Sequence, residues 1–174
     1  MRQLAAFVEI IAHEHRFTAT VYVHDQRLLD LLNDQTTDVV PINDVAVYRC
    51  SALEDAVAIL PEAIIHKADL HLVIITREER NQPTQRLFGY VQKMRYPVFL
   101  TVPGYDVQGA MHLLPSHDLD PTTILVNKAS TFFPVTNATI SEAWRGEEDF
   151  AVPVVMVNKR SLTLFSLGEA PMKT

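Results

Sequence analysis

The sequence predicts a mainly β fold of two small barrel-like units in tandem, related by an internal duplication and joined by a helical connector. One pattern is written twice: Val39–Val47 returns 93 residues later as Phe132–Ile140, and Leu60–Leu72 returns 92 residues later as Val152–Leu164. The runs within each copy are short and rich in β-branched and aromatic residues, with turn residues between them. Five short strands close most economically into a barrel, since closure removes exposed edges.

The repeat predicts the domain organisation. The first unit is expected over residues 1–76, an amphipathic connector over 77–96 and the second unit over 97–174. A unit of this size buries its surface only marginally by itself, so the two units are expected to pack as one body.

The first two strands of each unit are predicted to form a hairpin. The β-rich runs 4–12 and 17–24 are separated by the polar stretch His13-Glu14-His15. In the second copy this stretch aligns with Pro103-Gly104-Tyr105, and Pro-Gly is a strong turn signal. Both stretches are therefore predicted to be hairpin tips.

Short helices are predicted after these hairpins. Leucines give residues 26–33 an apolar face, and the counterpart over 121–127 is weaker because it holds more β-branched residues. Ser51-Ala52-Leu53-Glu54 fits a capping box, so a further short helix is expected over 52–60, ending at Pro61.

The remaining strands follow from the same patterns. Residues 39–50 are expected to form one bent strand or a strand pair, with Pro41 at an edge or a kink. Each unit is expected to end in a hairpin, which turns at Lys67-Ala68-Asp69 in the first copy and at 158–161 in the second.

The connector is the best candidate binding surface in the sequence. Leu87, Val91 and Met94 recur at helical spacing, and five basic residues stand against two glutamates, a local charge of +3. Such a surface could meet an acidic partner or nucleic acid, with tyrosine stacking, although an ordinary solvated helix face would look the same. The candidate binding residues are Arg77, Arg80, Arg86, Tyr90, Lys93 and Arg95 in the connector, and Lys67 and Lys159 in the matching hairpin turns.

Catalytic and metal-binding patterns are weak. His13 and His15 would share one face of a strand and could chelate a metal with His24, although a solvent-exposed turn explains the first two as well. Cys50 beside Arg49 could be a reactive thiol or a small core residue. No motif places a nucleophile with its base, and five glycines form no phosphate-binding loop. The prediction is a protein without enzymatic activity, resident metal or cofactor.

Charge and cysteine content point to the cytoplasm. The net charge is −6, with eight Lys and Arg against thirteen Asp and Glu in residues 1–86 and seven against eight in 87–174. An acidic body repels nucleic-acid backbones and anionic lipids. A single cysteine permits no internal disulfide, as expected in a reducing compartment. The first apolar run, Leu4–Ala12, is too short and too charged for a signal peptide or a membrane span.

Two resemblances carry further expectations. Residues 27–33, Val40-Pro41-Ile42-Asn43-Asp44 and the Lys67 hairpin, with their second-copy counterparts, resemble an uncharacterised bacterial family of short β-rich domains, which implies no activity. The order of a small-residue strand, an Asp turn and a basic final hairpin is similar to Sm-like and SH3-like barrels. The Sm-type RNA pocket implies an Asn where Leu29 stands and Arg-Gly-Asp where Lys67-Ala68-Asp69 stands, so that RNA site is not expected here.

The functional prediction is a non-catalytic protein-interaction or scaffold module in a bacterial cytoplasm. Its partner is expected to be another protein or a second copy of the chain, because two similar surfaces can pair. The alternatives are Sm-like RNA binding through the connector and hairpin loops, and a metal-binding protein or enzyme that uses His13, His15 and His24.

Overall fold

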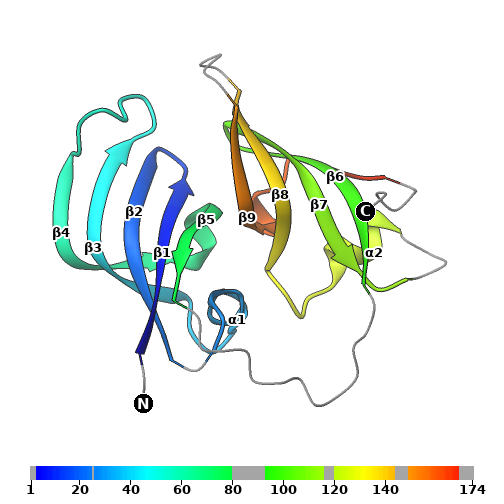
Figure 1. Ribbon diagram of the computed structural model, residues 1–174, viewed down its shortest axis with the longest axis horizontal. Coiled ribbons are helices and arrows are strands. Elements are labelled where there is room, and N and C mark those ends of the chain that lie inside the picture. Colours follow the sequence, from blue (N-terminus) through cyan, green and yellow to red (C-terminus); the bar gives the residue numbers. More distant parts are fainter. Residues whose placement is uncertain (1–2, 25, 80–92, 116–119, 144–148, 169–174) are drawn as a thin grey trace.

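The computed structural model describes residues 3–24, 26–79, 93–115, 120–143 and 149–168, and it is mainly β (Figure 1). The first half of the chain contains β1 (Gln3–Ala12), β2 (His15–His24), α1 (Leu28–Asn33), β3 (Val39–Arg49), β4 (Ala58–His66), the 3-10 turn η1 (Lys67–Asp69) and β5 (Leu70–Glu78). The second half contains β6 (Met94–Val102), β7 (Tyr105–Leu113), α2 (Pro121–Val126), β8 (Phe132–Glu142), β9 (Phe150–Asn158), η2 (Lys159–Ser161) and β10 (Leu164–Leu167).

The two halves have the same order of elements and the same order of strands in space. The described strands form one antiparallel sheet in the order β10-β6-β7-β8-β9-β5-β1-β2-β3-β4. The fifth strand of each half lies beside its first strand, and the fourth strand of each half lies at the far side. The duplication that the sequence suggests would produce this arrangement, and the duplication itself stays a prediction.

The expected pair of closed barrels is not what the strands form. A barrel would need β4 to pair with β5, and β9 to pair with β10. Instead β5 pairs with β9, in the register Leu72↔Val157, Val73↔Met156 and Ile74↔Val155. This junction, called the seam below, joins two curved half-sheets into one open sheet (Figure 1). The hydrogen-bonding edge of β5 is filled by the other half, so the sheet stays open at β4 and β10.

The seam strands form the wall between two hydrophobic cores. Residues Leu70–Ile74 of β5 are all buried, and alternate side chains point to opposite faces of a strand. Val73 lies in the first core, whereas Leu72 and Ile74 lie in the second. On β9, Met156 reaches back into the first core while Val155 and Val157 stay in the second. Each half therefore supplies side chains to the core of the other.

A matching β-bulge lies in each half. The register of β3 against β2 shifts between Thr18 and Thr20, and the backbone of Asp44 has φ 50°. The register of β8 against β7 shifts in the same way, and Asn137 has φ 47°. Asp and Asn tolerate this left-handed conformation better than other non-glycine residues, which accounts for the polar residue at a strand position.

Most predicted elements are confirmed, and one predicted helix is wrong. The hairpin tips, both short helices and the Lys67 and Lys159 turns stand where the patterns place them. The helix predicted over 52–60 does not form, because β4 begins at Ala58 and runs through Pro61 as an edge strand. The described ends of the predicted connector are also strand, since β5 extends to Glu78 and β6 begins at Met94. The rest of the connector, residues 80–92, lies outside the described residues.

Candidate functional site at the edge of the sheet

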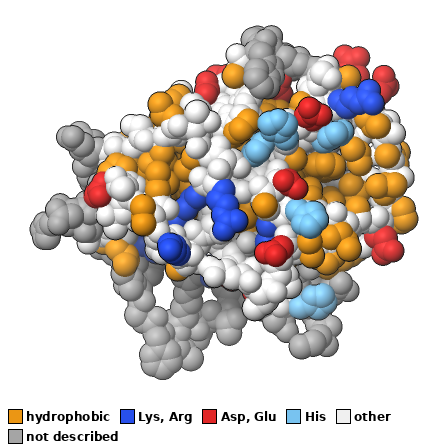
Figure 2. Space-filling model, turned by 180° about the vertical axis from the view of Figure 1, so that it is seen from behind, with side chains coloured by type: hydrophobic (Ala, Val, Ile, Leu, Met, Phe, Trp, Pro, Cys, Tyr) orange, Lys and Arg blue, Asp and Glu red, His pale blue; other side chains and the backbone are white. Residues whose placement is uncertain are grey.

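Among the described residues, no strand pairs with the outer side of β4, and this edge has exposed apolar side chains. Ile59 is 80% exposed and Ile64 is 70% exposed, and Leu60 is exposed between them. The neighbouring Ala63 and Ile65 pack on the first core, so Ile64 points away from it. Figure 2 shows hydrophobic side chains gathered on the side of the molecule where β4 ends the sheet. Free backbone groups beside exposed isoleucines make this edge suited to pairing with another strand.

The sequence of β4 partly protects this edge. Pro61 has no N–H to donate, and the charge of Glu62 opposes indiscriminate pairing. Both residues stand in the middle of the strand, so the apolar stretch Ala63–Ile65 beyond them stays available. In β9, Pro153 occupies the corresponding position, and the pairing with β5 uses only residues 155–157 beyond it. The proline therefore confines strand addition to a three-residue segment.

The seam shows what holds such a strand pair in this protein. The side chain of Asn33, at the end of α1, accepts hydrogen bonds from the backbone N–H groups of Thr131 (2.8 Å) and Phe132 (2.7 Å). Its amide also donates to the Phe132 carbonyl at 2.9 Å. Nearby, Asn158 is fully buried and donates to the Leu70 carbonyl at 2.8 Å. Asn158 thus satisfies a backbone carbonyl of β5, and Asn33 satisfies backbone groups at the start of β8, so each amide bonds the backbone of the other half.

The lysines predicted as binding residues have structural roles. Lys67 is buried, and its Nζ donates to the Asp34 carbonyl at 2.7 Å and to the Thr37 hydroxyl at 3.3 Å. Lys159 donates in the same way to the Asn127 carbonyl at 3.3 Å and, at 3.1 Å, to the hydroxyl of Ser130. Burial lowers the pKa of Lys159. Each ammonium holds the loop after a short helix, and a binding role for these lysines stays a prediction.

The predicted basic surface is not brought together by the described residues. Arg77 lies on β5, with its guanidinium 3.9 Å from the ring centroid of Phe7. Arg95 lies on β6, which three other strands separate from β5, and Lys93 is exposed just before it. Arg80, Arg86 and Tyr90 lie outside the described residues. RNA binding through the connector therefore stays a prediction.

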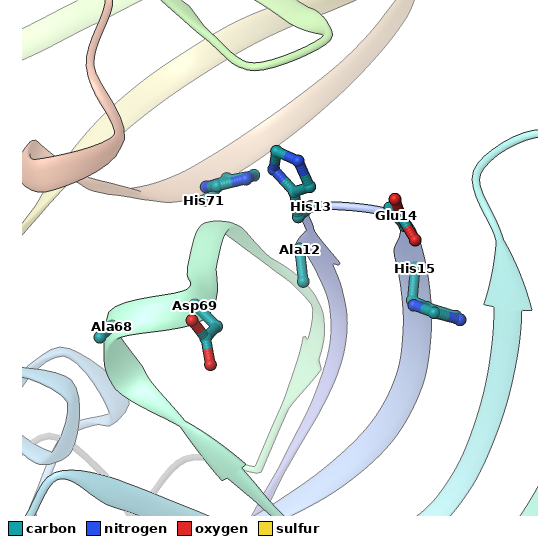
Figure 3. A pocket seen from close by; sticks show the side chains of 7 residues that line it. All are labelled: Ala12, His13, Glu14, His15, Ala68, Asp69 and His71. Atoms are coloured by element: carbon teal, nitrogen blue, oxygen red, sulfur yellow. The ribbon is translucent and has the colours of Figure 1, made fainter.

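The three histidines predicted to share a metal are separated. His15 begins β2 and His24 ends it, so nine residues of strand place them roughly 30 Å apart. His13 instead approaches His71 of β5, with ring centroids 5.9 Å apart in an edge-to-face arrangement. Both border a pocket that Ala12, Glu14, His15, Ala68 and Asp69 complete. Figure 3 shows the rings of His13 and His71 close together, whereas His15 points away from them.

His71 ties the two halves together at this pocket. Its Nδ1 lies 2.8 Å from the hydroxyl oxygen of Ser161 in η2, while its buried Nε2 has no hydrogen-bond partner in the part of the chain that the structure describes. The Ser161 hydroxyl also donates to the Leu70 carbonyl at 3.4 Å. Burial, and then the neighbouring His13, lower the pKa of His71. Within the described residues, no group of three or more His, Cys, Asp or Glu side chains could hold a metal ion.

Cys50, weighed as a reactive thiol or a core residue, lies at the contact between the halves. It is half-buried, and its Sγ is 3.9 Å from the hydroxyl of Tyr105 in β7. Burial raises the pKa of Tyr105, so this phenol stays neutral.

The unpaired edge is the feature that sequence reasoning missed. The capping-box pattern at 51–54 favoured a helix over 52–60, and this prediction hid the strand position of Ile59. Ile64 lies in the strand that the sequence predicts before the Lys67 turn, but the sequence does not show that this strand lies at the end of the sheet.

Comparisons with known proteins add no identification. The chain matches no family model, and no curated protein or solved structure is similar to it. The two α-helices in the described part of the chain have six residues each, and neither could cross a lipid bilayer. The class that the fold and the site define is a mainly β protein with an open sheet and an apolar edge strand.

Proposed function

We propose that the protein is a non-catalytic interaction or scaffold module of the bacterial cytoplasm, built from two copies of one β-rich unit, and that it binds a strand of another polypeptide at β4. The observation that carries this proposal is the exposed apolar edge formed by Ile59, Leu60 and Ile64. Strand addition at such an edge supplies backbone hydrogen bonds, and exposed side chains add apolar burial.

The seam supports this proposal, because the protein already uses strand pairing to join its halves. Three residue pairs join β5 to β9, and the side chains of Asn33, Asn158 and His71 add hydrogen bonds between the halves. Within the described residues, β4 pairs with β3 on one side and with no strand on the other. A long apolar edge is an aggregation hazard unless something covers it, so its retention favours a functional occupant.

Photo-crosslinking from the edge tests the proposal. A photoreactive phenylalanine analogue replaces Ile64 in one variant, and Leu114 in a matched control. Leu114 is also exposed and apolar but follows β7, away from the β4 edge. Illumination in the bacterial cytoplasm is expected to give a discrete protein adduct from position 64 and none from position 114. Mass spectrometry should place the linked residue of the adduct within a β-strand.

A second variant tests whether the adduct from position 64 depends on docking at the β4 edge of a folded protein. Ile59→Lys adds a charge at an exposed position of the edge, so it should leave the fold intact, as circular dichroism would report. It should reduce the adduct from position 64 because a buried lysine opposes docking. Equal adduct yields at positions 64 and 114, or no adduct at either, would reject strand binding at β4.

A further inference from the structure

We propose that the occupant of the β4 edge is a second copy of this chain, which contributes β10, so that copies join head to tail through an intermolecular version of the seam. This inference rests on the proposed function and names its partner. Its basis is the relation between the strands that are paired and those that are not. The seam joins the fifth strand of the first half to the fourth strand of the second half. The two strands at the ends of the sheet are the fourth strand of the first half and the fifth strand of the second half.

The correspondence between the halves can be made residue by residue. Lys67 and Lys159 make equivalent hydrogen bonds. Their hydroxyl acceptors, Thr37 and Ser130, stand at equivalent positions of the two halves. This alignment makes Ala63–Ile65 of β4 equivalent to Val155–Val157 of β9. It makes Leu164–Ser166 of β10 equivalent to Leu72–Ile74 of β5. The register of the seam then predicts the intermolecular pairs Ile65↔Leu164, Ile64↔Phe165 and Ala63↔Ser166.

Burial supports this pairing. Ile64 is 70% exposed, but its equivalent Met156 is only 6% exposed because it packs in the core of the other half. Leu164 is 48% exposed, but its equivalent Leu72 is fully buried in the same manner. Phe165 already packs on the core of its own half, as Val73 does. Both ends of the sheet thus keep large apolar residues at the positions that the seam buries.

The polar contacts of the seam are not all repeated at the free ends. The counterpart of Asn33 is Val126, an exposed apolar residue, so it could contact the neighbouring copy but could not bond its backbone. The counterpart of Asn158 is His66, and the counterpart of His71 is Thr163. Ser166 replaces Ile74, which reduces the apolar area. The intermolecular contact should therefore be weaker than the seam, which also benefits from linkage within one chain.

The two ends are different surfaces, and this determines the kind of assembly. A head-to-tail contact leaves one β4 and one β10 free at the ends of every open oligomer. Growth stops only if the rotation between copies closes a ring; otherwise filaments form. The association is expected to be concentration-dependent, with masses in multiples of the 19.6 kDa chain.

Cysteine cross-linking of two preparations tests the register. In a Cys50→Ala background, one preparation carries Ile64→Cys and another, with a larger tag, carries Phe165→Cys. Directly opposed residues have Cβ atoms about 4.5–5.5 Å apart, close to disulfide distance, whereas diagonal neighbours are about 7–8 Å apart. Mild oxidation is expected to give the mixed disulfide dimer. Glu62→Cys, two residues away on the same face, is the matched control and should give several-fold less.

Sedimentation of the wild-type chain tests self-association without replacing Phe165, which packs on the second core. The mass should rise above 19.6 kDa with concentration, and Ile64→Lys should hold it at 19.6 kDa. A wild-type chain that stays monomeric, or equal cross-linking from positions 62 and 64, would overturn the inference. If the chain is monomeric but position 64 photo-crosslinks to a different protein, self-assembly fails and strand binding at β4 stands. If position 64 gives no adduct of any kind, both proposals fail.

Discussion

Lys67 and Lys159 occupy equivalent places in the two halves, and each donates to the carbonyl of the residue that follows a short helix. The Nζ of Lys67 lies 2.7 Å from the Asp34 carbonyl oxygen, and the Nζ of Lys159 lies 3.3 Å from that of Asn127. A cation at the C-terminal end of a helix also interacts favourably with the helix dipole. The two lysines therefore fasten the turn between the second and third strand of each half.

Replacing these lysines should destabilise the protein unequally. Lys67→Met is expected to lower the free energy of unfolding by about 1–3 kcal/mol, because it leaves partly buried carbonyl and hydroxyl groups without a donor. Lys159→Met should cost less, since Lys159 is less buried and water can replace the ammonium. Urea denaturation of both variants measures the difference. An equal loss in the two would contradict the structural ranking.

Asn33 should matter more to stability than a neighbouring polar residue that also crosses the seam. Asn33→Ala removes three hydrogen bonds to the backbone around Phe132 and is expected to cost about 1–3 kcal/mol. Gln35 donates a single bond to the Lys128 carbonyl from an exposed position, so Gln35→Ala should change stability by less than about 0.5 kcal/mol. Thermal or urea unfolding compares them, and the opposite order would refute this account of the seam.

His71 should make the seam sensitive to acid. Burial and His13 lower the pKa of His71 below its unfolded value, and Asp69 opposes this only partly. The folded state thus favours the neutral ring, so the stability from this group is complete above pH roughly 6.5 and falls as the pH drops below it. His71→Gln is expected to flatten the decline in urea midpoint between neutral and mildly acidic pH.

His24 offers the control for this prediction, because it is exposed at the far end of β2. His24→Gln should retain the pH dependence of the wild-type chain. If His71→Gln and wild type lost stability in parallel as the pH fell, the titration of His71 would not be the cause.

Gly109 should not tolerate a side chain, although its counterpart in the first half is Ala19. A Cβ at position 109 would lie 2.5 Å from Cγ1 of Val135 and 2.9 Å from the Thr136 carbonyl oxygen. A valine cannot swing aside freely, so Gly109→Ala is expected to destabilise the protein by about 1–3 kcal/mol. The reverse change, Ala19→Gly, should cost only about 0.5–1 kcal/mol from backbone entropy. Denaturant unfolding of both variants checks this, and a neutral Gly109→Ala would show that β7 and β8 can separate.

Much of the local structure could be predicted because local patterns determine it. The Pro-Gly turn at 103–104 located one hairpin, and the alignment of the copies located the equivalent tip at His13. The leucine pattern likewise predicted α1, and the turns at Lys67 and Lys159 were predicted from their polar residues. The helix expected over 52–60 was wrong because a capping box is a local signal, and the pairing of β4 with β3 outweighed it.

The candidate site could not be predicted in the same way. The exposed isoleucines of β4 become a site only because β9, rather than β4, occupies the free side of β5. His13 and His71 are 58 positions apart in the chain and meet only because β1 and β5 are neighbours. Pairing between distant strands depends on which apolar faces complete a core, and no short stretch of sequence records that choice.

By itself, the sequence determined the number and order of the strands and the recurrence of one pattern, since turn chemistry and side-chain alternation act over a few residues. Only the tertiary structure decided that the halves share a wall at β5 and β9 instead of closing separately. The physical reason is burial: Leu72 and Ile74 on one side of the seam and Met156 on the other each fill the opposite core, which two separate barrels would leave incomplete.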